Sequence, residues 1–392
     1  MPKFPQTADR IQHLEGSVFE KFREKMKAQG PKLVRLHIGD TYLQPTYALP
    51  IVSAFMEKYR TFNRYCHTYG IEGIRKALAT KLQEDNHLPV SEDNILLTSG
   101  ATNALSIAIQ TLVNHGEDVL VFTPAWPFFF GMVKMVGARV IEVPFYTRLF
   151  HHPDLPIAEY LSNYLTPRTV AIYLNTPNNP SGKVLDIKHL QQIAEFARTH
   201  QLWIISDEAY DGLTYDGRAH ISIGHLPGLF EQTLTIFTFS KIFMFAGLRL
   251  GYLVAHSNMI HACNRTLVHQ MYSPSTLAQY MMIEPIQNRH QWMPRVRHHY
   301  QQLRDHFVKN LQIPVPIPEG TYFIFFSLKP YLNDRDYWQL FHQLMDNGVS
   351  VAPGQDFGKD FQDYIRICFT GEPLERLQIA IDRLNRFFKT RR

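Results

Sequence analysis

The stretch TLTIFTFSKIFMFAGLRLGYLVA, residues 233–255, contains two apolar segments typical of strands, TLTIFTFS and LGYLVA, on either side of a loop that carries Lys241. Large apolar residues surround this lysine in the sequence: Phe237, Phe239, Ile242, Phe243 and Phe245. Burial disfavours the charged form of an amine and lowers its pKa, and the neutral amine is a nucleophile for a carbonyl carbon. Lys241 is therefore a candidate for Schiff-base chemistry. The alternative is an ordinary lysine at the end of a strand.

Similar strand-like segments precede this stretch and alternate with helical sequences. They are NILLTS (94–99), DVLVFTP (118–124), RVIEVPF (139–145), TVAIYLNTP (169–177) and LWIISDEAY (202–210). Residues 101–115 and 188–201 have helical patterns, and the second places Leu190, Ile193, Phe196 and Ala197 on one face. Almost continuously apolar strands that alternate with amphipathic helices indicate a mostly parallel sheet covered on both faces. With the two segments of residues 233–255, we predict an α/β fold whose large domain has a mostly parallel seven-stranded sheet between layers of helices.

The pattern changes after residue 285. A long polar and basic helical sequence (294–311) is followed by a strand, a helix, a second strand and a terminal helix, which predicts a smaller α+β domain. We predict that residues 1–45 form an N-terminal arm and part of the small domain, residues 46–285 the large domain, and residues 286–392 the small C-terminal domain. Ligands commonly bind between two such domains.

The composition fits a soluble globular enzyme, with 45% hydrophobic and 19% charged residues. The N-terminus has no secretion-signal pattern, no apolar run is long enough to cross a bilayer, and the three cysteines are far apart, so we expect a cytoplasmic protein. The net charge of +5 is scattered, which argues against nucleic acid as a partner and favours small anionic molecules. The histidine pairs His151-His152 and His298-His299 lack a ligand spacing such as HExxH, so we expect no metal site.

The loops that follow the expected strands lack the motifs GxxxxGK[ST], GxGxxG and GxSxG. Instead, Ser99-Gly100-Ala101-Thr102 leads from a strand into a helix, and the free amides and positive dipole of a helix start suit a phosphate. Trp126 offers a flat face for stacking, and Asn179 lies in a turn fixed by prolines and a glycine. Asp207 ends a strand, where its carboxylate can keep a pyridine nitrogen protonated, and Arg249 can pair with a phosphate. Each residue alone has an ordinary structural explanation, but together they match pyridoxal 5'-phosphate.

The order of these motifs resembles the class I/II aminotransferases, which belong to the fold-type I aspartate aminotransferase superfamily of pyridoxal-phosphate enzymes. The resemblance extends from about Leu36 to Phe369. It comprises Tyr65 to Gly70 with Ile74-Arg75, Ser99-Gly100-Ala101-Thr102, Pro124-Ala125-Trp126, Asn179-Pro180-Ser181-Gly182, Asp207-Glu208-Ala209-Tyr210, Ser240-Lys241, Gly247-Leu248-Arg249-Leu250-Gly251, and Arg366. Ser181 replaces the more usual threonine but keeps a hydroxyl. Asp40-Thr41-Tyr42 replaces the usual acidic-Pro-acidic sequence after Gly39, which leaves the local loop and the side-chain pocket undefined.

The resemblance implies a role for each matching residue. Lys241 holds the cofactor covalently and acts as the general base, Asp207 pairs with the pyridine nitrogen, and Tyr210 assists at the phenolic oxygen; these three are the expected catalytic residues. The expected cofactor-binding residues are Gly100, Ala101, Thr102, Trp126, Asn179, Asp207, Tyr210, Thr238, Ser240, Lys241 and Arg249, with Tyr65 reaching the phosphate from a neighbouring subunit. The expected substrate-binding residues are Gly39, Asn179 and Arg366, of which the arginine clamps the α-carboxylate.

The activity implied by the resemblance is that of a pyridoxal-phosphate-dependent aminotransferase. It moves the amino group of an L-amino acid to a 2-oxo acid through aldimine, quinonoid and ketimine intermediates, in a homodimer with shared active sites. A lyase, cyclase or decarboxylase on the same scaffold is an alternative, because the motifs do not show which substrate bond is cleaved. A non-catalytic pyridoxal-phosphate-binding module is a further alternative, although residues 1–45 leave no room for the DNA-binding domain that such regulators carry. The sequence does not identify the substrate side chain.

Overall fold

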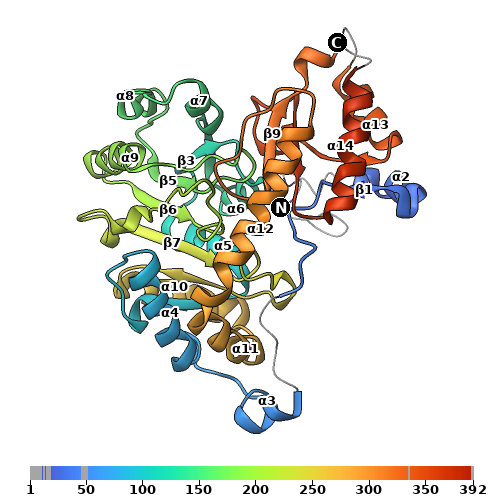
Figure 1. Cartoon of the computed structure of the whole chain (residues 1–392). Helices are drawn as coiled ribbons and strands as arrows, with labels where there is room; N and C mark the ends of the chain where they lie inside the picture. The colour runs from blue at the N-terminus through green and yellow to red at the C-terminus, as the bar shows by residue number, and fades with distance from the viewer. Residues whose placement is uncertain (1–10, 12–13, 15–18, 46–51, 334–335, 390–392) are drawn as a thin grey trace, which may run out of the picture.

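A seven-stranded sheet is the largest element of the computed structural model, which describes residues 11, 14, 19–45, 52–333 and 336–389 (Figure 1). Helices cover both faces of this sheet, which confirms the α/β fold expected from the sequence. The strands are β2 (Ile95–Thr98), β3 (Asp118–Thr123), β4 (Arg139–Pro144), β5 (Thr169–Asn175), β6 (Trp203–Asp207), β7 (Thr233–Thr238) and β8 (Gly251–Val254).

The strands lie in the order β2-β8-β7-β6-β5-β3-β4. β8 runs antiparallel to both of its neighbours, and the other adjacent strands are parallel. Where β5 pairs with β6, Asn175 lies opposite Asp207, so two polar residues at the carboxyl ends of these strands are side by side. Open α/β sheets bind their ligands at this edge.

The helices around the sheet continue its alternating pattern. They are α4 (Glu72–Asp85), α5 (Gly100–Leu112), α6 (Pro127–Met135), α7 (Tyr146–His151), α8 (Ile157–Ser162), α9 (Ile187–Thr199), α10 (Ser257–Met271) and α11 (Thr276–Gln287). A further helix, α3 (Val52–Lys58), lies apart from the sheet (Figure 1). The four apolar positions expected on one face of the helix at 188–201 are all buried in α9. Among the helices of the described residues, none combines the length and the apolar character needed to cross a bilayer.

Alternating residues of β5 separate the core into two layers, because successive side chains of a strand point to opposite faces. Ala171 and Tyr173 pack in the cluster formed with α5, α6 and α10. Ile172 and Leu174 pack in the cluster formed with α7, α8 and α9. Burying a large apolar side chain contributes about 1.5–3 kcal/mol, so these layers hold the edge of the sheet in place. The polar ends of β5 and β6 are thereby fixed on the α5 side.

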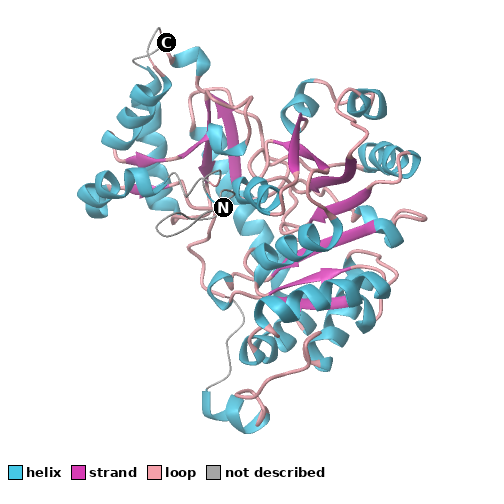
Figure 2. Ribbon diagram, turned by 180° about the vertical axis from the view of Figure 1, so that it is seen from behind, coloured by secondary structure: helices cyan, strands magenta, loops and turns pink. Residues whose placement is uncertain are grey.

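The N-terminal segment and the C-terminal part form a second, smaller group of strands, which Figure 2 shows apart from the large sheet. Their elements are α2 (Phe19–Gln29), β1 (Val34–Arg35), α12 (Arg289–Asn310), β9 (Phe323–Ser327), α13 (Tyr337–Asp346), β10 (Val349–Ser350), β11 (Ala352–Pro353), β12 (Tyr364–Cys368) and α14 (Leu374–Lys389). β12 pairs antiparallel with β9 and β11, and β1 pairs parallel with β10. The blue α2 lies beside α13 in Figure 1. Between these two helices, Phe22 stacks on Trp338 at 5.8 Å between ring centroids.

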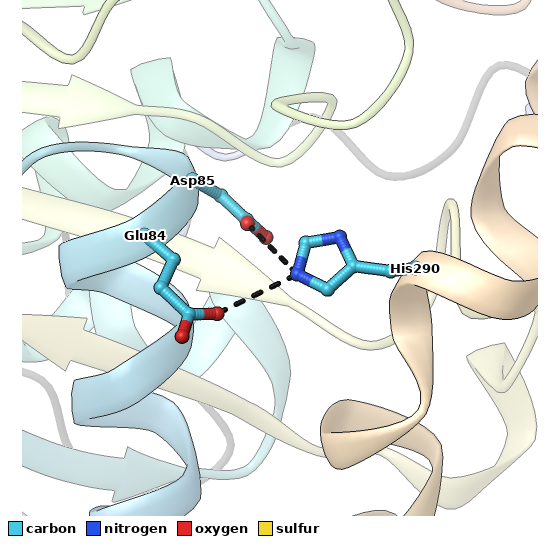
Figure 3. A group of neighbouring side chains, drawn as sticks. All are labelled: Glu84, Asp85 and His290. Atoms are coloured by element: carbon cyan, nitrogen blue, oxygen red, sulfur yellow. Dashed lines mark hydrogen bonds and ion pairs between the residues drawn. The ribbon is translucent and has the colours of Figure 1, made fainter.

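An ion-pair cluster fastens the start of α12 to the end of α4 (Figure 3). Glu84 and Asp85 of α4 face His290 of α12, with closest contacts of 3.5 and 3.7 Å. The neighbouring Arg289 is buried and donates to Asp85 through Nε at 2.6 Å and to Glu84 through Nη2 at 2.5 Å. Because this guanidinium pairs with both carboxylates and links them to α12, the cluster is a structural joint between α4 and α12.

Candidate active site

A cavity of about 220 Å³ lies at the carboxyl ends of β5, β6 and β7, beside the start of α5. Ten of the residues expected at a cofactor site line it: Ala101, Thr102, Trp126, Asn179, Asp207, Tyr210, Thr238, Ser240, Lys241 and Arg249. Leu105, Asn175, Ala209 and Ala246 complete its wall. Loops that are far apart in the sequence therefore meet at one place.

Lys241 extends into this cavity from a loop whose apolar neighbours anchor it in the core. Phe239 and Ile242, on either side of the lysine, are buried. The amine lies 5.5 Å from the ring centroid of Tyr210 and donates to the carbonyl oxygen of Gly39 at 2.7 Å. Burial lowers the pKa of the Lys241 amine to about 8. A sizeable fraction of this amine is neutral near physiological pH, as a nucleophile or general base requires.

Asp207 is a buried carboxylate on the floor of the cavity. Its Oδ2 accepts a hydrogen bond from the hydroxyl of Tyr173 at 2.8 Å, and its Oδ1 accepts one from the backbone amide of Ala209 at 3.1 Å. Burial raises the pKa of Asp207 to about 6. Both donors are neutral, so a protonated ring nitrogen in the cavity would complete the charge balance of this carboxylate. This is the environment that a pyridine cofactor needs.

Arg366 of β12 contacts Asn179, which lines the cavity. The guanidinium donates from Nη1 to Oδ1 of Asn179 at 2.9 Å and from Nη2 to the carbonyl oxygen of His37 at 2.8 Å. It lies over the rings of Phe323 and Phe357, at 4.3 and 5.0 Å from their centroids. Its Nε is buried and has no hydrogen-bond partner among the described residues. A buried guanidinium with an unused donor is suited to a carboxylate ligand.

The start of α5 forms a cradle of backbone amides next to two hydroxyls and a guanidinium. Gly100 begins the helix with a φ of +76°, and a Cβ there would lie 3.1 Å from Nη2 of Arg249. The backbone amide of Ser240 donates to Oγ1 of Thr238 at 3.1 Å, which fixes the two hydroxyls beside each other. A helix start with nearby hydroxyls and an arginine is an anion site that suits one phosphate.

Gly251 allows this cradle to form. It pairs with Thr98 of β2 on one side and with Thr238 of β7 on the other. A Cβ at this position would lie 2.7 Å from the carbonyl carbon of Gly100 and 2.8 Å from the amide nitrogen of Ala101. Only glycine lets β8 pass so close to the start of α5.

Comparison with known proteins identifies the family. A sequence profile described as aminotransferase class I and II matches residues 31–384. The chain belongs to the class I and II aminotransferases. It is 32% identical to the aspartate aminotransferase of Pyrococcus abyssi over 335 residues, which cover 84% of this chain and 85% of that relative. It is 30% identical to aromatic-amino-acid aminotransferase 2 of Thermococcus litoralis over 98% of this chain and 99% of the relative.

Solved structures agree with this assignment. The aspartate aminotransferase from Thermus thermophilus with maleate superposes with a TM-score of 0.87 at 28% identity, covering 98% of this chain and all of the other. The aromatic aminotransferase from Pyrococcus horikoshii OT3 gives a TM-score of 0.85 at 28% identity, with 98% of each chain covered. The expected family, fold and enzyme class are therefore confirmed: the protein is an aminotransferase. Members of this family depend in general on pyridoxal phosphate.

Four expected residues of the aminotransferase site lie outside the lining of the first cavity: Gly39, Tyr65, Gly100 and Arg366. Gly100 directly precedes Ala101 of the lining. Gly39 contacts it through the hydrogen bond from Lys241, and Arg366 contacts it through Asn179. Tyr65 is remote: its side chain is 87% exposed, and its ring packs at 5.2 Å on Tyr272. A role for Tyr65 in the site requires a second subunit, as the resemblance implied.

Two residues that position Asp207 were not expected from the sequence. Asn175 donates from Nδ2 to the carbonyl oxygen of Asp207 at 2.8 Å, and its Oδ1 accepts from the backbone amide of Asn179 at 2.7 Å. Tyr173 binds the Asp207 carboxylate, and its ring stacks on Phe129 at 3.7 Å. Their position on β5 could have indicated this role. Alternate residues of a strand lie on the same face of the sheet, and near the carboxyl end of a parallel strand they lie close to the end of the adjacent strand.

Proposed function

We propose that this aminotransferase holds pyridoxal 5'-phosphate in the first cavity and exchanges an amino group there between an L-amino acid and a 2-oxo acid. The observation that carries the proposal is the placement of three groups around one cavity: the Lys241 amine, the Asp207 carboxylate and the start of α5. The fit rests on the buried Asp207, which has only neutral donors, and on the anion cradle at Gly100.

Different residues of the cavity would bind different parts of the cofactor. Thr238, Ser240 and Arg249 would bind the phosphate together with the amides at the start of α5, and Trp126 would stack on the ring. When bound, pyridoxal 5'-phosphate supplies an electron sink that stabilises negative charge at the substrate α-carbon. Asp207 holds the proton on the ring nitrogen, and Tyr173 and Asn175 keep Asp207 in position.

The substrate is oriented by Arg366 and deprotonated by Lys241. The unused Nε of Arg366 and one of its terminal nitrogens form a fork for the α-carboxylate. Lys241 Nζ would take the proton from the α-carbon as general base and, as general acid, would deliver it to the cofactor carbon bonded to the amino nitrogen, which its pKa of about 8 allows near neutral pH. Tyr210 and Asn179, which both line the cavity, would bind the phenolic oxygen of the cofactor.

We also propose a cytoplasmic homodimer, in which Tyr65 of one protomer binds the phosphate held by its partner. The exposed Tyr65 and Tyr272 pair supports this arrangement, because large exposed aromatic side chains commonly mark an interface. The cysteines Cys66, Cys263 and Cys368 are free thiols, which fits a reducing compartment. The names of the relatives suggest aspartate and aromatic amino acids as amino donors.

The half-reaction with single amino acids tests the proposed function. The purified holoenzyme is mixed with each amino acid of a panel, without any 2-oxo acid acceptor. Conversion of the cofactor absorbance to that of its aminated form, with one 2-oxo acid released per site, is the expected result. Continuous release of ammonia or carbon dioxide without an acceptor would instead show an elimination or a decarboxylation.

A further inference from the structure

A second and larger cavity, of about 810 Å³, adjoins the site. It shares Thr102 and Trp126 with the first cavity, and Arg366 lies in its wall. Its size is within the range of about 300–1,000 Å³ that is usual for ligand pockets. The arginine expected to bind the α-carboxylate therefore stands at the junction of the two cavities.

One wall of this cavity is an apolar stripe on α6. Phe128, Gly131, Met132 and Met135 follow the spacing of one helix face and all line the cavity. Phe128 and Met135 are each 49% exposed, although they are large and apolar. The ring of Phe128 contacts Trp126 edge-on at 5.2 Å, so the apolar surface continues into the cofactor cavity. Exposed apolar surface beside a reaction site commonly marks a ligand groove.

The opposite wall is a loop of the C-terminal part, which two hydrogen bonds hold against the sheet. The backbone amide of Ala125 donates to the carbonyl oxygen of Phe357 at 2.9 Å. The backbone amide of Lys359 donates to Oε2 of Glu142 at 2.8 Å. Phe357 also lies under the guanidinium of Arg366, so this wall places an aromatic ring directly beside the carboxylate anchor. These two hydrogen bonds fix the position of this wall relative to the sheet.

The charges around the cavity do not favour a second carboxylate in the ligand. Apart from Arg366, which is assigned to the α-carboxylate, the lining has two positive charges, from Lys134 and Lys359, and two negative ones, from Glu142 and Asp356. Both lysines are exposed to solvent, where water competes for their ammonium groups. The stripe on α6 is the more extensive contact surface, and its two methionines adapt readily to apolar ligands.

We infer that the second cavity receives the side chain of the amino donor and selects large apolar side chains, such as those of phenylalanine, leucine and methionine. The inference rests on the proposed function, which assigns the substrate carboxylate to Arg366 and the α-hydrogen to Lys241. The side chain then extends into the space beside Arg366 and Trp126 that Lys241 does not occupy. The second cavity provides this space, and Phe128, Met132 and Phe357 make its surface apolar.

Inhibition of the wild-type holoenzyme by three carboxylic acids tests the inference without any mutation. Propionate, 3-phenylpropionate and succinate each present a carboxylate to Arg366, and they differ in the group at the other end of the molecule. We expect 3-phenylpropionate to inhibit at a concentration at least about tenfold lower than either of the others, since apolar pockets discriminate by such factors. Equal inhibition by all three acids, or strongest inhibition by succinate, overturns the inference.

A matched pair of variants locates the effect. Met132→Glu places a charge on the stripe and should lower the ratio of kcat/KM for phenylalanine to kcat/KM for alanine at least about tenfold. Met56→Glu, on α3, is the control, because Met56 is also a methionine on a helix but does not line the cavity. Met132→Leu should keep the wild-type ratio. An unchanged ratio in Met132→Glu overturns the inference while leaving the proposed function intact, whereas failure of every amino acid to yield a 2-oxo acid refutes the proposed function itself.

Discussion

The hydroxyl of Tyr173 donates a 2.8 Å hydrogen bond to Oδ2 of Asp207, within a core where both side chains are buried. Tyr173 lies on β5 and Asp207 ends the adjacent β6, so the pairing of two parallel strands fixes this contact. A donor to a carboxylate favours its charged form and lowers its pKa, whereas burial raises it. Tyr173 therefore offsets part of the burial effect at the residue proposed to hold the proton of the cofactor ring.

Tyr173→Phe removes this donor and should raise the pKa of Asp207 further above its present value of about 6. A hydrogen bond to a charged group contributes about 1.5–3 kcal/mol, so we expect kcat to fall by roughly tenfold or more, with an acid limb of the pH profile shifted upward. The control is Tyr215→Phe, because Tyr215 is equally buried and its hydroxyl binds the carbonyl oxygen of Thr321. Equal pH profiles for the two variants would show that Tyr173 acts only on stability.

Arg366→Lys retains the positive charge but loses the planar fork. We expect kcat/KM for every amino donor to fall by about thirtyfold or more, the effect of disrupting a buried charged pair. Arg304→Lys is the matched control: Arg304 is also a buried arginine, but it pairs with Asp216. The control should lose stability and keep its kcat/KM. A small effect of Arg366→Lys, similar to that of the control, would contradict the role of Arg366 as carboxylate anchor.

Gly251→Ala should open the phosphate cradle, because the added Cβ would lie within 2.7–2.8 Å of the backbone of Gly100 and Ala101. Overpacking of this kind costs about 1–3 kcal/mol, so the Kd for pyridoxal 5'-phosphate should rise by about tenfold. Gly247→Ala is the control in the same segment, since a Cβ at Gly247 has no described atom within 4 Å. Titration of the cofactor-free variants by fluorescence measures both values. An unchanged Kd in Gly251→Ala would place the phosphate elsewhere.

The pKa of Lys241 predicts a pH-dependent stability difference in the cofactor-free protein. Its folded-state pKa of about 8 lies below the ordinary value of 10.5, so the folded form binds this proton less tightly than the unfolded form does. The stability that this lysine contributes is fully present above pH 10.5 and is lost as the pH falls through 8. The free energy of unfolding of Lys241→Met should therefore rise relative to that of the wild type as the pH falls from 10 to 7, by on the order of 1 kcal/mol.

Urea unfolding of both cofactor-free proteins at the two pH values measures this difference. Lys188→Met, which replaces an exposed lysine on α9, controls for the loss of a charge as such. The same difference between wild type and Lys241→Met at both pH values would show that the amine titrates normally in the folded state.

Much of the fold followed from local sequence patterns. The apolar strands and the spacing of Leu190, Ile193 and Ala197 were sufficient to predict the large sheet and its covering helices, because burial dictates those patterns. The pairing of β1 with β10, where Val34 lies opposite Val349, could not be predicted, since strands of two residues carry no periodicity. The docking of α2 on α13 is a long-range contact of the same kind.

For the site as for the fold, local motifs were sufficient to predict some residues, whereas others depend on contacts between distant segments. The apolar sequence neighbours of Lys241 make it a candidate, yet their side chains are buried in the core, and the rings near its amine belong to Tyr210 and Tyr322. Tyr173 and Asn175 were missed because their roles depend on the register of β5 against β6. Tyr65 is expected to reach the phosphate of a neighbouring subunit. This role therefore stays a prediction for the single chain.

The covalent attachment of the cofactor to Lys241 is the central claim, and borohydride trapping tests it most directly. Reduction of the holoenzyme fixes any Schiff base as a stable amine, and peptide mapping by mass spectrometry then locates the pyridoxyl group. We predict the label on Lys241, with none on Lys241→Ala, which should keep its fold and bind the cofactor without a covalent bond. A label on another lysine of the wild-type protein, or unchanged labelling of Lys241→Ala, would contradict the account.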